Sequence, residues 1–151
     1  PIHVDACLGG FVFPFLDEFP PSDFRLLGVQ SISVDTHKYG CCPKGSSVLV
    51  FRDKKYFECC YFIQSEWSGG IYATTNITGS RSGLNLAWTW AMLTYQGYDT
   101  LSNQAHKISR NLEKIKSAFE DDSDIKIYGN PRVCVAGFGS DTLNIYNPLS
   151  Y

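Results

Sequence analysis

Two consecutive stretches of helical periodicity, separated by Gly97, constrain the fold of this chain more than any other feature. Apolar residues recur in them at intervals of three and four, which places these residues on one face of each helix. They are Leu84, Trp88, Ala91, Met92 and Tyr95 in the first stretch, and Leu101, Ala105, Ile108, Leu112, Ile115 and Phe119 in the second. The pattern predicts a helix over residues 82–96, which Gly97 ends or bends, and a second helix over residues 101–119.

Short runs that are typical of β-strands lie on both sides of this helical region. We expect strands at residues 2–6, 31–35, 47–51, 125–128 and 133–138. The order along the chain, strands followed by long helices and then by strands, indicates an α/β chain with two units. We place the boundary between them near Tyr98. The expected units are residues 1–98 and residues 99–151.

The composition favours a folded protein that binds a small molecule. With 44% hydrophobic and 15% aromatic residues, the chain has enough apolar material for a core. Its 13 basic and 15 acidic residues are scattered and sum to a charge of -2. The sequence therefore shows no cluster of basic residues that would bind nucleic acid or an anionic membrane. The six cysteines include two adjacent pairs, which suit neither a disulfide framework nor a zinc site. We therefore expect reduced thiols in an intracellular protein, and no metal.

The two ends of the sequence favour an internal piece of a longer protein. Pro1 leads at once into an apolar strand, and residues 144–151 add no closing element. No apolar run has the length of a membrane span, and the first residues lack the pattern of a signal peptide. Any targeting segment is expected outside this sequence.

A lysine and an aspartate accompany the ends of two different predicted strands. Lys38 lies on the turn after residues 31–35, where a side chain can reach across the carboxyl edge of a sheet into a ligand crevice. Asp5 lies at the end of a strand that we expect to be buried, where a carboxylate is costly unless it meets a cation. A protonated pyridine nitrogen would be such a cation, and a lysine amine that forms an imine would complete an electron sink. Taken alone, Lys38 would be read as a solvated loop residue.

The segments around these two residues resemble one enzyme superfamily, the group II pyridoxal-phosphate decarboxylases. His3-Val4-Asp5-Ala6-Cys7-Leu8-Gly9-Gly10 is similar to their aspartate strand, and Ser33-Val34-Asp35-Thr36-His37-Lys38-Tyr39-Gly40 is similar to their lysine segment. Further motifs resemble the sphingosine-1-phosphate lyases of this superfamily more closely than its amino acid decarboxylases. These motifs are Thr36-His37-Lys38-Tyr39-Gly40, Pro43-Lys44-Gly45-Ser46-Ser47, Gly69-Gly70-Ile71-Tyr72 and Gly79-Ser80-Arg81-Ser82-Gly83. The similarity keeps its order to at least Phe138, so it covers nearly the whole chain.

The resemblance implies a role for each of five residues, and no metal ligand. Lys38 would hold pyridoxal 5'-phosphate as a Schiff base, Asp5 would pair with its pyridine nitrogen, and His37 would lie beside its phosphate. Lys44 would help to bind the phosphate of the substrate, although as a surface charge it would be unremarkable. Ser80 would reach the cofactor phosphate of a neighbouring subunit, which implies a homodimer with a shared active site; its motif alone would be read as an ordinary helix cap.

The resemblance also implies the fold and the reaction. The fold would be α/β, of the fold-type-I pyridoxal-phosphate class. Residues 1–98 would form part of the mainly parallel sheet of the large domain, and residues 99–151 a linking helix and the start of the small C-terminal α/β domain. The enzyme would be a carbon-carbon lyase of sphingolipid breakdown. It would cleave the C2–C3 bond of a phosphorylated long-chain base to a long-chain aldehyde and phosphoethanolamine. Its setting would be the endoplasmic reticulum membrane, facing the cytosol, with the membrane anchor outside this sequence.

Two alternatives stay open at this point. A group II amino acid decarboxylase would share the aspartate and the lysine but would break the bond to a carboxylate. A truncated product without catalysis would fold or bind partners only, because the family segment that stacks on the cofactor ring lies outside this sequence. Trp67, Trp88 and Trp90 are expected in the core or an interface, and His3 and His106 have no partner that the sequence reveals.

Overall fold

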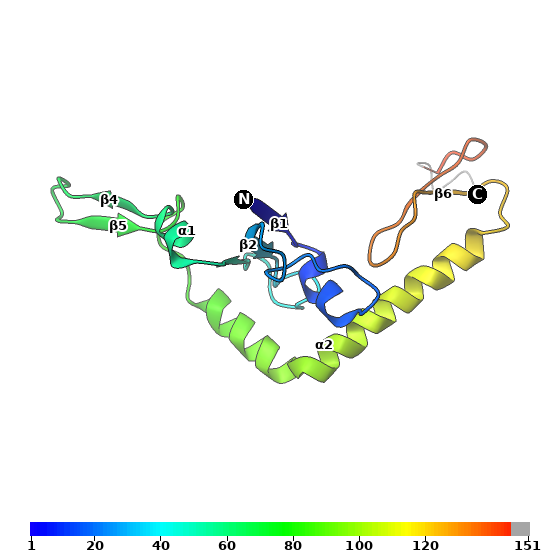
Figure 1. Cartoon of the computed structure of the whole chain (residues 1–151), viewed down its shortest axis with the longest axis horizontal. Helices are drawn as coiled ribbons and strands as arrows, with labels where there is room; N and C mark the ends of the chain where they lie inside the picture. Colours follow the sequence, from blue (N-terminus) through cyan, green and yellow to red (C-terminus); the bar gives the residue numbers. More distant parts are fainter. Residues whose placement is uncertain (146–151) are drawn as a thin grey trace. The chain divides into compact units, whose positions relative to one another are not determined.

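The structure, a computed structural model of the chain, describes residues 1–145. Residues 146–151, part of the stretch in which we expected no closing element, lie outside the described residues. In chain order the elements are β1 (Ile2–Asp5), η1 (Gly9–Phe11), η2 (Phe13–Phe15), β2 (Val29–Val34), β3 (Val48–Phe51), α1 (Lys54–Glu58), β4 (Phe62–Gln64), β5 (Tyr72–Thr74), α2 (Leu84–Phe119), β6 (Lys126–Tyr128) and β7 (Gly137–Gly139) (Figure 1). The chain forms two compact units, one of residues 1–10 and 19–95, the other of residues 11–18 and 96 onward.

The first unit is built on a three-stranded sheet in the order β1-β2-β3. β1 runs parallel to β2, with His3 opposite Ser31 and Asp5 opposite Ser33, whereas β3 runs antiparallel to β2. β2 is the central strand and begins with the fully buried Val29. β1 and β3 are the edges of this sheet, so most of their side chains are exposed, whereas we expected the strand at residues 2–6 to be buried.

A close contact fixes the turn after β1 against the end of β2. A Cβ atom placed on Gly10 would lie only 2.5 Å from Cγ1 of Val34, so only glycine fits without a shift. The turn therefore brings the segment after Asp5 close to the end of the strand that precedes Lys38.

Arg52 ties β3 to the loop that leads into β2. Its guanidinium donates hydrogen bonds to the carbonyl oxygens of Val29 at 2.7 Å and of Phe24 and Leu26 at 2.6 Å. It also lies 5.4 Å from the centre of the Phe24 ring. One side chain thus satisfies three backbone acceptors.

Replacing Arg52 by Ala should destabilise the protein by roughly 1.5–3 kcal/mol, because charged hydrogen-bond donors are lost from three carbonyl groups together. Urea denaturation measures the change. Lys54→Ala is the control, since Lys54 makes only an exposed pair with Glu58 and its loss should cost at most about 1 kcal/mol. Equal stabilities of the two variants would contradict this role of Arg52.

The two predicted helices are confirmed. α2 covers both, and its helical backbone is interrupted at Gly97, with φ 65° and ψ 178°. Only glycine adopts this region without strain, which explains why the periodicity of the sequence breaks there. The second helix buries Leu101, Ala105 and Leu112 of its predicted apolar face.

The second unit also contains Val12 and Leu16 as buried residues, together with the antiparallel pair β6 and β7. β6 confirms the strand expected at residues 125–128. The strand expected at residues 133–138 is largely wrong, because β7 comprises only Gly137–Gly139. Val133 is 5% exposed, so this end of the apolar run fills the core instead of pairing along its length.

The first unit also contains elements that the sequence did not predict. α1 begins after Asp53, whose carboxylate accepts a hydrogen bond from the backbone N–H of Lys55. β4 and β5 then form an antiparallel hairpin, with Trp67 packed edge-on against Tyr72.

Among residues 1–145, no helix has both the length and the apolar character needed to cross a membrane.

Candidate active site

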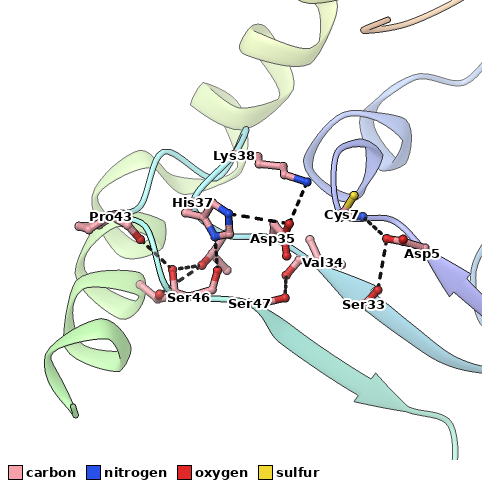
Figure 2. Close-up of polar contacts among 12 residues, drawn as sticks. Asp5, Cys7, Ser33, Val34, Asp35, His37, Lys38, Pro43, Ser46 and Ser47 are labelled. Atoms are coloured by element: carbon pink, nitrogen blue, oxygen red, sulfur yellow. Dashed lines mark hydrogen bonds and ion pairs between the residues drawn. The ribbon is translucent and has the colours of Figure 1, made fainter. Parts of the chain in front are cut away.

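The turn after β2 places Lys38 at the carboxyl end of the sheet (Figure 2). The backbone N–H of Lys38 donates to the carbonyl of Asp35 at 3.2 Å, and the N–H of Cys41 donates to the carbonyl of Lys38 at 3.0 Å. Nζ of Lys38 lies 2.9 Å from Oδ2 of Asp35. The lysine predicted from its position after a strand is therefore held at the sheet edge by the acid three residues before it.

The ion pair sets the protonation of both groups. Asp35 raises the pKa of Lys38, and the neighbouring Cys7 side chain adds to this effect. In turn, hydrogen bonding to Lys38 lowers the pKa of Asp35. Lys38 is therefore held as an ammonium ion, and its amine becomes a nucleophile only when that proton leaves.

Asp35→Asn should move the reactivity of Lys38 to lower pH. The carboxylate stabilises the ammonium form, so its removal lowers the pKa of Lys38 and leaves more neutral amine at a given pH. Competitive labelling with acetic anhydride over a pH series, read by peptide mass spectrometry, measures the shift. Asp53→Asn is the control, because Asp53 pairs with Lys55. An unchanged profile for Lys38, or a shift to higher pH, would contradict the prediction.

His37 lies on the same turn, and its ring is oriented by the backbone. Nδ1 donates to the carbonyl oxygen of Ser46 at 2.6 Å, and Nε2 lies 3.8 Å from Oδ2 of Asp35 (Figure 2). The backbone contact assigns the hydrogen to Nδ1 when the ring is neutral. In this neutral tautomer Nε2 can accept a hydrogen bond from a ligand, and it pairs with the Asp35 carboxylate only when the ring carries a second proton.

The loop that contains Lys44 is fastened to this turn. Thr36 and Ser46 are both buried, and the Thr36 hydroxyl donates to Oγ of Ser46 at 2.5 Å. Asn85, at the start of α2, donates to the carbonyl of Gly45 at 3.1 Å. Lys44 itself is exposed, and no acidic group in the described part of the chain pairs with its ammonium. A free cation on an anchored loop is suited to binding an anion.

Asp5 ends β1 at the same edge as Lys38, because β1 and β2 run parallel. Its Oδ1 accepts hydrogen bonds from the backbone N–H of Cys7 at 3.1 Å and from the hydroxyl of Ser33 at 3.4 Å (Figure 2). The hydrogen bond from Cys7 is the main reason why the pKa of Asp5 is lowered. Asp5 is exposed at this edge, so the apolar setting that we expected for it is wrong for the described chain.

Ser80 lies apart from these contacts. With Gly79 it lines a cavity of about 570 Å³ beside the β4–β5 hairpin, together with residues that include Tyr61, Phe62 and Tyr72. No hydrogen bond within residues 1–145 joins Ser80 to Asp5, His37 or Lys38. The cap of α2 is Ser82, whose hydroxyl accepts from the N–H of Leu84 at 3.2 Å, so the capping role considered for the Ser80 motif falls to Ser82.

Sequence reasoning missed two participants at this edge. Asp35 belongs to the segment that contains Lys38, but its spacing of three from Lys38 was the only signal of an ion pair. His3 contacts the hydroxyl groups of Ser31 and Ser33. The signal was the matching alternation of His3 with Asp5 and of Ser31 with Ser33 in two neighbouring strands.

The donor set fits pyridoxal phosphate. A lysine amine is the group that condenses with an aldehyde, and a carboxylate is the group that pairs with a protonated ring nitrogen. Within residues 1–145 no lysine or arginine forms an ion pair with the Asp5 carboxylate, so it can pair with such a cation. Among the same residues, no cluster of three or more His, Cys, Asp or Glu side chains is placed to hold a metal ion.

Comparison with known proteins defines the class first. A sphingosine-1-phosphate lyase structure from Burkholderia pseudomallei matches with a TM-score of 0.86 and 40% identity, over 95% of this chain and 34% of that chain. A Lactobacillus brevis glutamate decarboxylase matches with a TM-score of 0.68 and 28% identity, over 83% of this chain and 28% of that chain. The fold is therefore the α/β fold of the fold-type-I pyridoxal-phosphate enzymes, as expected.

The family follows from the sequence match. The model of the pyridoxal-dependent decarboxylase conserved domain matches residues 1–139, and the chain belongs to this family. Mouse sphingosine-1-phosphate lyase 1 is 42% identical over 151 residues, which are 97% of this chain and 27% of the relative. The lyase of Saccharomyces cerevisiae is 39% identical over 152 residues, which are 97% of this chain and 26% of the relative. The resemblance seen in the sequence is confirmed, and the chain spans about a quarter of the length of these relatives.

Proposed function

We propose that the protein to which this chain belongs is a pyridoxal-phosphate-dependent carbon-carbon lyase. It cleaves the C2–C3 bond of sphingosine 1-phosphate or sphinganine 1-phosphate and yields a long-chain aldehyde and phosphoethanolamine. The observation that carries the proposal is the identity of about 40% to sphingosine-1-phosphate lyases along nearly the whole chain. The lysine and the aspartate at one sheet edge supply the chemistry that this reaction needs.

Each site residue has a task in this proposal. Bound pyridoxal phosphate supplies an aldehyde for the substrate amine and a ring that accepts the electron pair of the breaking bond. Lys38 would bind the cofactor covalently through Nζ, and Oδ2 of Asp5 would hold the proton on the ring nitrogen. His37 would lie beside the cofactor phosphate. Lys44 binds the substrate phosphate, and a base takes the hydroxyl proton as the bond breaks in retro-aldol fashion.

We further propose that the active site is shared within a homodimer. Ser80 lines the cavity beside the β4–β5 hairpin, and the resemblance to the lyases assigns it to the cofactor phosphate of a second subunit. Residues 1–98 would belong to the large domain and residues 99–151 to the linking helix and the small domain. The proposed setting, the cytosolic face of the endoplasmic reticulum membrane, rests on the likeness to the lyases alone.

Product analysis on the protein that contains this chain tests the reaction. Incubation with sphingosine 1-phosphate should release hexadecenal and phosphoethanolamine, which mass spectrometry detects, and incubation with free amino acids should release no carbon dioxide. If an amino acid releases carbon dioxide and the lipid releases no aldehyde, the protein is a decarboxylase, like the 28% identical structure, and not a lyase. Neither product, together with no cofactor absorbance, would favour a protein without catalysis.

A further inference from the structure

A chain of hydrogen bonds runs along one face of β1 and β2 and ends at Asp5. Nδ1 of His3 lies 2.8 Å from Oγ of Ser31, and Nε2 of His3 lies 3.2 Å from Oγ of Ser33. Oγ of Ser33 lies 3.4 Å from Oδ1 of Asp5 (Figure 2). The parallel register explains the arrangement, because it sets His3 opposite Ser31 and Asp5 opposite Ser33, and alternate residues of a strand share a face.

The hydroxyl of Ser33 gives this chain a direction. A serine hydroxyl has one hydrogen, and Ser33 donates it to the carboxylate of Asp5. Its oxygen must therefore accept from Nε2–H of His3, and Nδ1 of the neutral ring then accepts from the hydroxyl of Ser31. The donors run from Ser31 through His3 and Ser33 to Asp5. The hydrogen bonds in such a chain polarise one another, which strengthens the last, charge-assisted bond.

The two oxygens of Asp5 consequently differ. Oδ1 accepts from the backbone N–H of Cys7 and from the hydroxyl of Ser33, whereas neither of these two donors contacts Oδ2. Two donors on one oxygen fix the rotation of the carboxylate. The other oxygen is then presented in a defined direction at the carboxyl edge of the sheet.

We propose that His3 and Ser33 are positioning residues that keep Asp5 ionised and turn Oδ2 toward the ring nitrogen of the cofactor. This inference rests on the proposed function, in which Asp5 pairs with that nitrogen. If His3 and Ser33 were only structural, their substitution would change the stability of the sheet. If they position Asp5, their substitution should weaken the part of cofactor binding that depends on the ring nitrogen.

A cofactor analogue separates these two roles. In 1-deazapyridoxal phosphate a C–H group replaces the ring nitrogen, so Asp5 has no cation to hold. Equilibrium dialysis of the full protein, stripped of cofactor, measures the dissociation constants of both compounds. Ser33→Ala and His3→Leu should each weaken binding of pyridoxal phosphate about two- to tenfold, the usual effect of one net hydrogen bond, and should leave binding of the analogue unchanged. His3→Gln, which can donate to Ser33, should recover part of the loss.

The control is Gln30→Ala, which removes a polar β2 side chain that donates to the carbonyl of Leu27 and makes no contact with Asp5. It should change the affinities for the two compounds by the same factor. Equal weakening of both compounds by Ser33→Ala and His3→Leu, or no weakening of either, would overturn the positioning role. If His3→Leu fails to fold, Ser33→Ala decides the question, because it removes a single oxygen atom.

Asp5→Asn distinguishes failure of this inference from failure of the proposed function. It should weaken binding of pyridoxal phosphate selectively. If it does so while Ser33→Ala and His3→Leu do not, only the positioning role is wrong. If Asp5→Asn shows no selectivity between the two compounds, the pairing of Asp5 with the ring nitrogen is itself wrong.

Discussion

Asp5→Asn is expected to slow turnover by roughly a hundred- to a thousand-fold, the usual effect of removing one well-placed electrostatic partner of a transition state. Asparagine fills the same space and still forms hydrogen bonds, but it carries no negative charge to stabilise a protonated ring nitrogen. Because the ring of the bound cofactor would accept the electron pair of the breaking bond, the loss should appear mainly in kcat. Steady-state kinetics with sphingosine 1-phosphate measures it.

Asp23→Asn is the matched control for this substitution. Asp23 also has a lowered pKa, which comes from its hydrogen bonds with Arg25 in a loop before β2. Its loss should leave kcat unchanged. Near-native turnover of Asp5→Asn would contradict the proposed role, and global unfolding of that variant, seen by circular dichroism, would mark Asp5 as a structural residue.

Lys44→Ala should leave the cofactor bound but remove most of the activity. Lys44 is exposed on an anchored loop, and we propose that its ammonium holds the phosphate of the substrate. Loss of one charged hydrogen-bond donor should lower kcat/KM about ten- to a hundredfold. The visible absorbance of the bound cofactor should not change.

Lys54→Ala provides the corresponding control, because Lys54 is an exposed lysine whose ammonium already pairs with Glu58. It should retain both the absorbance and the activity. Loss of the cofactor absorbance in Lys44→Ala would show that Lys44 serves the cofactor, which would refute the division of tasks between Lys38 and Lys44.

The predictable parts of the fold are those with long or well-delimited patterns. Helical spacing over many turns located both parts of α2, and the break of that spacing identified Gly97. The hairpin of β4 and β5 escaped prediction because its strands are three residues long and largely exposed, so they show no alternation of apolar and polar residues. Trp67, Trp88 and Trp90 are likewise exposed on the described chain. Their expected place in an interface stays a prediction.

Only those features of the candidate site that depend on local sequence were predictable. Lys38 and Asp5 could be placed at one sheet edge, because both accompany strand ends and parallel strands end together. The contacts of His3 with Ser31 and Ser33 depend on the register of β1 against β2, which no single segment encodes. The exposure of Asp5 was missed for a related reason: a short apolar run indicates a strand but does not say whether that strand is central or at an edge.

Covalent mapping of the cofactor tests the central claim most directly. The protein purified with pyridoxal phosphate is reduced with borohydride, which makes the attachment permanent, and its peptides are analysed by mass spectrometry. We expect the label on Lys38 and an unlabelled Lys44. A label on any other lysine, or no covalent label in a protein that shows cofactor absorbance, would contradict the assignment of Lys38 and with it the account of this site.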